Sequence, residues 1–143
     1  MWIVPAERMK AGREHRVPLS ARALAILETV RPLGGRGYVF PGQKPGRPLS
    51  YTAFEMLLRR MKANCTTHGF RSSFRAWAGE ASSFPREIAE QALAHVVGDA
   101  TERAYRRGDA LEKRRRLMDA WAGYCEPRAG SKVVPMVRNR RGG

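Results

Sequence analysis

The chain has 143 residues, and 27 lysines and arginines against 13 aspartates and glutamates give it a formal net charge of +14. So large an excess favours a polyanionic partner, and nucleic acid is favoured over a membrane because no apolar run approaches the roughly 20 residues that span a bilayer. Cys65 and Cys125 form no CxxC pair and the N-terminus lacks the pattern of a secretion signal, so we expect reduced thiols in a cytoplasmic protein.

The basic character is spread along the chain. Residues 1–125 hold 22 basic and 12 acidic residues, so the excess does not depend on the C-terminal end. Residues 126–143 combine five basic residues with one acidic residue, and their composition predicts a basic disordered tail. We therefore expect one folded domain over 1–125, followed by a tail over 126–143.

The first predicted elements are a hairpin and a helix. Residues 2–5 and 15–18 are short extended segments, which predicts a β-hairpin with Gly12 at the turn and Lys10 near the tip. Ser20 is a plausible N-cap for an amphipathic helix over about 21–31.

The next segment predicts a strand, a loop and a second helix. Residues 37–40 resemble a brief strand, and residues 41–48 form a loop rich in glycine and proline. Ser50 is expected to cap a helix whose apolar residues recur at helical spacing. These residues are Phe54, Leu57, Leu58 and Met61.

The remaining predicted elements are all helical. A third helix begins near His68, with Thr66 or Thr67 as its cap, and a fourth runs from Pro85 to about Leu93. Further helices are expected around Tyr105 and over 111–124. The predicted fold class is α+β and mostly α, with a small N-terminal β-hairpin region followed by five or six helices.

The segment 68–77 has two faces at helical spacing. Phe70, Phe74 and Trp77 share one face and are best explained as core. The other face carries a second group of residues, His68, Arg71 and Arg75. A histidine and an arginine three residues apart at a helix start suit a bound phosphate, although a solvated polar face is the alternative.

Two later motifs give this pair a context. A Leu-x-His motif follows at Leu93–His95, and a tyrosine follows ten residues later at Tyr105. His-x-x-Arg, Leu-x-His and Tyr in this order and spacing resemble the catalytic signature of the tyrosine recombinase and integrase family. Lys10 stands where that family has its catalytic lysine, and residues 111–124 are similar to the end of integrases carried by phages and genomic islands.

The resemblance implies a helical catalytic core and phosphoryl transfer at a DNA phosphodiester, with neither cofactor nor metal. Tyr105 would attack phosphorus and form a 3′-phosphotyrosine, because its hydroxyl is activated by a base and by cationic groups. His68 is the candidate base and Arg71 the main phosphate clamp. Lys10 would protonate the leaving 5′-oxygen, and His95 would donate to a non-bridging oxygen.

The other tyrosines are expected to be structural, and four arginines are expected to contact DNA. Each remaining tyrosine adjoins or ends a predicted element and is interpreted as structural: Tyr38, Tyr51 and Tyr124. Further DNA contacts are expected from four arginines, which are Arg13, Arg75, Arg106 and Arg107.

The resemblance also implies partners and a longer protein. The partners would be double-stranded DNA at attachment sites and other integrase protomers in a synaptic complex, in the cytoplasm of a bacterium and associated with its nucleoid. The helix over 111–124 would dock on a neighbouring protomer through four apolar residues, Leu111, Leu117, Met118 and Trp121. The family's first catalytic arginine precedes the hairpin, and only nine residues precede Lys10 here. We therefore expect a partial catalytic domain, without the separate core-binding and arm-binding domains and with little activity alone.

Three alternative interpretations remain open at this point. The chain could be a noncatalytic DNA-binding remnant of an integrase. A zinc site is a second possibility, with ligands Cys65, His68, His95 and Cys125. The basic run 113–116 is interpreted as a solvated helix face or, alternatively, as a contact to the DNA backbone.

Overall fold

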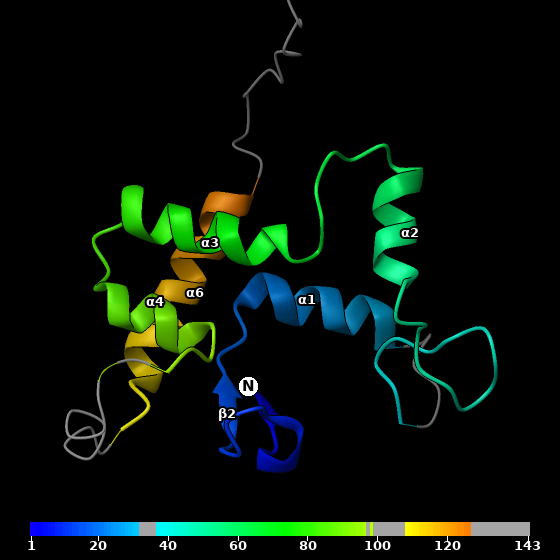
Figure 1. Cartoon of the computed structure of the whole chain (residues 1–143), viewed down its shortest axis with the longest axis horizontal. Helices are drawn as coiled ribbons and strands as arrows, with labels where there is room; N and C mark the ends of the chain where they lie inside the picture. Colours follow the sequence, from blue (N-terminus) through cyan, green and yellow to red (C-terminus); the bar gives the residue numbers. More distant parts are fainter. Residues whose placement is uncertain (32–36, 97, 99–107, 127–143) are drawn as a thin grey trace, which may run out of the picture.

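The computed structural model describes residues 1–31, 37–96, 98 and 108–126, and its architecture is mostly helical with one small sheet (Figure 1). The described helices and strands are β1 (Trp2–Val4), a 3-10 turn (Ala6–Arg8), β2 (His15–Val17), α1 (Ala21–Val30), α2 (Ala53–Arg60), α3 (Gly69–Glu80), α4 (Arg86–Ala92) and α6 (Leu111–Cys125). The α+β class with an N-terminal hairpin is thus confirmed. The helix expected around Tyr105 and the tail from residue 127 onward lie outside the described residues.

The predicted hairpin is present. β1 and β2 pair antiparallel, with Trp2 opposite Val17 and Val4 opposite His15. The connection contains the 3-10 turn, which was not predicted, and Gly12 has a φ of +61°, a left-handed conformation that glycine adopts without steric cost.

α1 begins as predicted. Ser20 has extended backbone geometry, and its hydroxyl accepts a hydrogen bond from the Ala23 backbone N–H at 3.2 Å. This bond satisfies one of the N–H groups that have no partner inside the helix, which is why serine favours this position.

Two predictions between α1 and α3 are wrong. Residues 37–40 are not a strand: in the part of the chain that the structure describes, the pairing near them is an isolated bridge between Pro41 and Pro48 in the following loop. The cap of α2 is also displaced: the helix begins at Ala53 after Thr52, and Ser50 contributes its backbone carbonyl to the preceding turn. α2 has the predicted amphipathic pattern, but Phe54, Leu57 and Met61 remain exposed.

The core lies where α3, α4 and α6 pack together (Figure 1). The buried apolar residues are Phe74, Trp77, Ala78, Ile88, Ala89 and Leu117. Phe74 and Trp77 confirm two of the three predicted core aromatics. Phe70 is the exception at 54% exposed, because it lies in the first turn of α3, which extends past α6 towards α1 (Figure 1).

The apolar face of α6 packs on its own chain. Leu117 is completely buried in the core, and the Trp121 ring packs edge-on against Phe74 with centroids 5.5 Å apart. Tyr124 stacks on Trp121, which fits its assignment as structural. Leu117 is thus buried and Trp121 partly buried within the chain, which favours the intramolecular alternative to docking of these two residues on a neighbouring protomer. Among the described helices, none has both the length and the apolar character needed to cross a bilayer.

Candidate active site

Arg71 and His95 are in direct contact although 24 residues separate them. Arg71 lies in the first turn of α3, and its Nη2 donates to the Leu93 carbonyl at 2.7 Å. The same Nη2 lies 3.0 Å from His95 Nε2. Both side chains are exposed, so the pair is accessible to a ligand.

The C-terminal turn of α4 places His95. Ala94 has a φ of +58°, its N–H donates to the Gln91 carbonyl, and the His95 N–H donates to the Glu90 carbonyl. These two bonds around a left-handed residue form a Schellman motif, in which glycine is the usual left-handed residue. The motif reverses the chain, so that His95 leaves the helix axis and turns towards α3.

His95 is held from behind by a buried acid. Glu90 is 8% exposed, and its Oε2 lies 2.5 Å from His95 Nδ1. Its Oε1 forms an ion pair with Arg75 Nε at 2.7 Å, without the alignment of a hydrogen bond. Arg75, expected to contact DNA, is therefore engaged with Glu90 in this structure. The hydrogen bond from His95 lowers the pKa of Glu90 below its ordinary value, although burial acts in the opposite direction.

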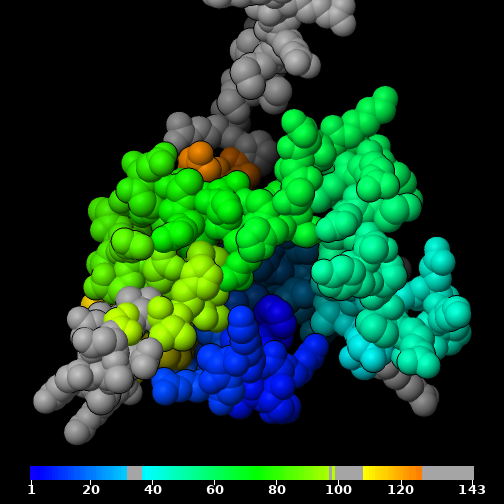
Figure 2. Space-filling model, in the orientation of Figure 1, coloured from blue at the N-terminus to red at the C-terminus, as the bar shows by residue number. Residues whose placement is uncertain are grey.

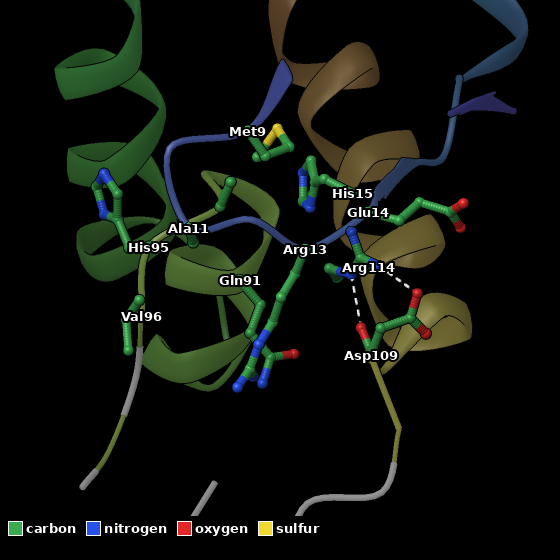
Figure 3. Close-up of a pocket in the computed structure, with 11 residues that line it drawn as sticks. Met9, Ala11, Arg13, Glu14, His15, Gln91, His95, Val96, Asp109 and Arg114 are labelled. Carbon is green, nitrogen blue, oxygen red and sulfur yellow. Dashed lines mark hydrogen bonds and ion pairs between the residues drawn. The ribbon is translucent and has the colours of Figure 1, made fainter. Parts of the chain in front are cut away.

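A cleft of about 210 Å³ opens between the hairpin and the end of α4. Its wall consists of Met9, Ala11, Arg13, Glu14, His15, Gln91, Ala94, His95, Val96, Asp109 and Arg114 (Figure 3). His95 lies on one side, the Asp109–Arg114 pair lies on the other, and Arg13 projects between them (Figure 3). Figure 2 shows the blue hairpin directly beside the yellow-green residues that end α4, so segments about 80 residues apart in sequence form one surface.

The structure brings together some predicted site residues and leaves others apart. Lys10 lies in the turn between Met9 and Ala11, which line the cleft with His95, so the hairpin carries Lys10 to this region. His68 is the residue before α3 and is exposed. Within the described part of the chain, neither the Lys10 nor the His68 side chain makes a hydrogen bond or ion pair. The remaining predicted residues, Tyr105, Arg106 and Arg107, lie outside the described residues.

The interpretation of the basic run 113–116 as a solvated face is wrong for Arg114. Arg114 is 1% exposed, and its guanidinium donates to the Asp109 carbonyl, the Arg16 carbonyl and the Asp109 carboxylate at 2.6 to 2.9 Å. Arg16 contacts the same carboxylate at 2.8 Å. The cluster joins β2 to the start of α6 and so fixes the far wall of the cleft.

His15 is a further titratable group in the cleft wall that sequence reasoning did not select. Burial, followed by the positive charge of Arg114, lowers the pKa of His15 below its ordinary value, while the Ala92 backbone acts in the opposite direction. The neutral form is therefore favoured, and the ring adds no positive charge beside Arg114.

Of two site residues that sequence reasoning missed, Arg114 had a signal in the sequence and Glu90 did not. Arg114 falls at helical spacing within the apolar series Leu111, Met118 and Trp121, which marks it as inward-facing. Glu90 is an acid five residues before His95, but this spacing becomes a contact only because of the left-handed turn at Ala94. That turn has no glycine to reveal it in the sequence.

The zinc alternative gains no support from the geometry. Across residues 1–31, 37–96, 98 and 108–126, no group of three or more histidine, cysteine, aspartate or glutamate side chains is arranged to hold a metal ion. Cys65 and Cys125 are both exposed free thiols.

Comparison with known proteins identifies the family of the chain. The model of the phage integrase family matches residues 1–112, more than half of the chain. The chain belongs to the phage integrase family. The hairpin and the Arg71–His95 pair lie within this matched segment, as do all residues that line the cleft except Arg114.

Several curated integrases are similar over most of the chain. Prophage integrase IntA of Escherichia coli K12 is 41% identical over 137 residues, which is 93% of this chain and 33% of that protein. Prophage integrase IntZ of the same strain is 35% identical over 83% of the chain and 30% of that protein. The integrase of Enterobacteria phage P4 is 28% identical over 96% of the chain and 36% of that protein. The chain thus spans about a third of the length of these integrases, and no solved structure matches it.

Proposed function

We propose that residues 1–125 are part of the catalytic domain of a tyrosine-type site-specific DNA recombinase. The observation that carries the proposal is the contact of Arg71 with His95 beside the hairpin that bears Lys10, in a chain of the phage integrase family. Integrase activity belongs to the named relatives, which are about three times as long. For this chain it is the proposed activity, with double-stranded attachment-site DNA as substrate and other integrase protomers as partners, in the bacterial cytoplasm at the nucleoid.

The described groups suit a phosphodiester. Arg71 presents a forked, permanently charged donor, and the His95 ring lies 3.0 Å from one of its nitrogens. A non-bridging phosphate oxygen that replaces this direct contact would lie within reach of both groups. Arg13, and Lys10 on the neighbouring turn, add positive charge on the hairpin side of the cleft. Such preorganised donors are most effective where negative charge develops in the transition state.

The proposed chemistry assigns one task to each group. The Tyr105 oxygen attacks phosphorus, the bond to the 5′-oxygen breaks, and a 3′-phosphotyrosine results. His68 accepts the tyrosine proton, Lys10 supplies a proton to the leaving 5′-oxygen, and Arg71 and His95 stabilise the pentavalent phosphorus. Attack by the 5′-hydroxyl of another strand reverses these steps and rejoins DNA. Arg106 and Arg107 are proposed to contact the DNA backbone, and residues 126–143 are proposed to form a basic disordered tail.

A chimera tests the proposal at the length of its relatives. The 137-residue region of E. coli IntA that matches this chain would be replaced by the chain itself, and recombination between IntA attachment sites would be measured. Arg71→Lys keeps the charge but loses the fork, and we expect its DNA cleavage rate to fall about 10²- to 10³-fold. Cleavage at the full rate by this variant contradicts the assignment of Arg71. DNA binding with no cleavage by the unsubstituted chimera favours the noncatalytic remnant instead.

A further inference from the structure

Glu90 is a buried acid to which the proposed reaction gives no task. Its side chain lies on α4, and its two carboxylate oxygens have different neighbours. Oε2 is 2.5 Å from His95 Nδ1, whereas Oε1 is 2.7 Å from Arg75 Nε and 3.8 Å from Arg86 Nε. A charge removed from water is costly unless it is paired, and here the pairing is divided between a proposed catalytic side chain and two arginines.

The contacts around His95 determine which ring nitrogen carries the proton. A guanidinium has donors and no acceptor, so Nε2 of His95 must accept from Arg71. Nδ1 must then carry the hydrogen, which it donates to the Glu90 carboxylate. The ring is thereby fixed in the Nδ1–H form, with Nε2 directed towards Arg71.

We propose that Glu90 is a positioning residue for His95, which holds the imidazole through Nδ1 so that Nε2 faces the position of the reacting phosphate. The identity of that phosphate rests on the proposed function, whereas the tautomer and the contact do not. Carboxylates behind functional histidines commonly fix the tautomer and orientation of the ring in this way.

The same contact has a consequence for the bound state. To donate to a phosphate oxygen, Nε2 must carry a proton, which comes from solvent when the phosphate replaces Arg71 beside it. Nδ1–H remains on Glu90, so the resulting imidazolium lies between a carboxylate and the phosphate. Besides Arg71, which contacts His95 from α3, the other charged or titratable groups that line this cleft are Arg13, Glu14 and His15 from the hairpin, and Asp109 and Arg114 at the start of α6.

A purely structural role makes a different prediction. If Glu90 only anchors α3 to α4, its important partner is Arg75, and His95 is an incidental neighbour. Removal of Arg75 should then disturb the site as much as removal of Glu90 does. If Glu90 positions His95, the two changes should have different effects on the ring.

The first test is the tautomer of His95 by nitrogen-15 NMR of the imidazole rings in the 143-residue chain. The sequence contains three histidines, so a His95→Gln variant assigns the His95 signals. At mildly alkaline pH we expect His95 to show a protonated Nδ1 and an unprotonated Nε2. An Nε2–H ring in the unsubstituted chain overturns the proposal.

Three variants separate positioning from anchoring. Glu90→Ala removes the acceptor, and we expect its His95 ring to exchange between both tautomers. Arg75→Gln is the matched control, because it removes the nearer of the two arginines at Oε1 and keeps the Oε2 contact, and it should preserve the Nδ1–H form. Equal loss of the tautomer in both variants overturns the proposal. If Glu90→Ala does not fold, Glu90→Met serves in its place, since it keeps much of the side-chain volume without an oxygen acceptor, and an unaltered His95 ring in that variant is the contradicting result.

Cleavage by the IntA chimera supplies the functional measurement. We expect Glu90→Gln to lower the cleavage rate about 10- to 100-fold, as outer carboxylates behind functional histidines do, with DNA affinity changed less than about 2-fold. Glu90→Asp should restore part of the rate. A Glu90→Gln chimera that cleaves at the full rate contradicts a positioning role. If the unsubstituted chimera fails to cleave, the proposed function fails, and the NMR result still decides whether Glu90 fixes the ring.

Discussion

Arg114 shows how a single side chain joins distant parts of this integrase chain. Its guanidinium satisfies two backbone carbonyls and the Asp109 carboxylate while almost completely buried. Arg114→Ala removes the donor to both carbonyls and leaves the Asp109 carboxylate with Arg16 alone, and breaking a buried charged contact costs about 3 kcal/mol of unfolding free energy. Urea unfolding of this variant should therefore show a much lower midpoint. Arg115→Ala is the control: that residue has only a partly exposed pair with Glu112, so its change should stay within about 0.5 kcal/mol. Equal effects of the two substitutions contradict the assigned role of Arg114.

His15 makes the unfolding free energy depend on pH. Its pKa is lower in the folded protein than the ordinary 6.5, so between these two values the unfolded chain binds more protons. Unfolding free energy is therefore retained above about pH 6.5 and decreases as the pH falls through the pKa of the folded state. Denaturation at a series of pH values should show this decrease, and His15→Gln should reduce its slope. A steeper decrease in the variant contradicts the assignment.

Sequence patterns predicted residues of the candidate site, such as Arg71 and His95, but not the side chains that hold the site in place. The order of Arg71, His95 and Tyr105 predicted the family, and the contact of Arg71 with His95 agrees with the expected grouping of these two. Glu90 and Arg114 were missed because their partners are far in sequence or depend on a turn, and a pattern of residue types carries no such distances. The prediction for Phe70 was wrong for a different reason: its helical spacing is right, but the side chain lies near the start of α3 and remains 54% exposed.

At the scale of elements, local sequence signals predicted structure correctly where nearby residues supply the hydrogen-bond partners of the backbone. Ser20 caps α1 as predicted, because a cap requires only residues three positions away. Residues 37–40 did not form a strand, because a strand needs a partner that the local sequence does not supply. Short sheets are thus predictable here only as hairpins, in which the turn brings the partner.

The end of α4 allows a test of how His95 is placed. Ala94 holds a left-handed conformation in the Schellman motif, which costs an L-residue about 1–2 kcal/mol, partly offset because alanine restricts the unfolded chain more than glycine does. Ala94→Gly should therefore raise the unfolding free energy by roughly 0.5–1 kcal/mol while the His95 ring keeps its Nδ1–H form. A control is Ala76→Gly inside α3, which should lower stability by about 1 kcal/mol. Destabilisation by Ala94→Gly contradicts the motif.

On the scale of the whole molecule, the hairpin lies beside the residues that end α4 (Figure 2), and the cleft between them is supported by the α3–α4–α6 core. The fold class, the hairpin and most helices were predictable because they follow local periodicity and caps. The packing of α6 on its own chain was not, since an apolar helix face indicates burial without identifying the surface that buries it. Leu117 and Trp121 show this limit most clearly.

The most direct test of the proposed chemistry is the identity of the amino acid that becomes joined to DNA. The IntA chimera would be incubated in EDTA with an attachment-site duplex that is nicked close to the cleavage site. Cleavage then releases a short strand that carries the 5′-hydroxyl, and its loss prevents rejoining and traps the covalent intermediate. Peptide mapping by mass spectrometry should find the DNA 3′-phosphate on Tyr105, and Tyr105→Phe should abolish the adduct because it keeps the ring and removes the attacking oxygen. Attachment at Tyr38, Tyr51 or Tyr124, or cleavage that requires Mg²⁺ and leaves no protein–DNA bond, would contradict the account.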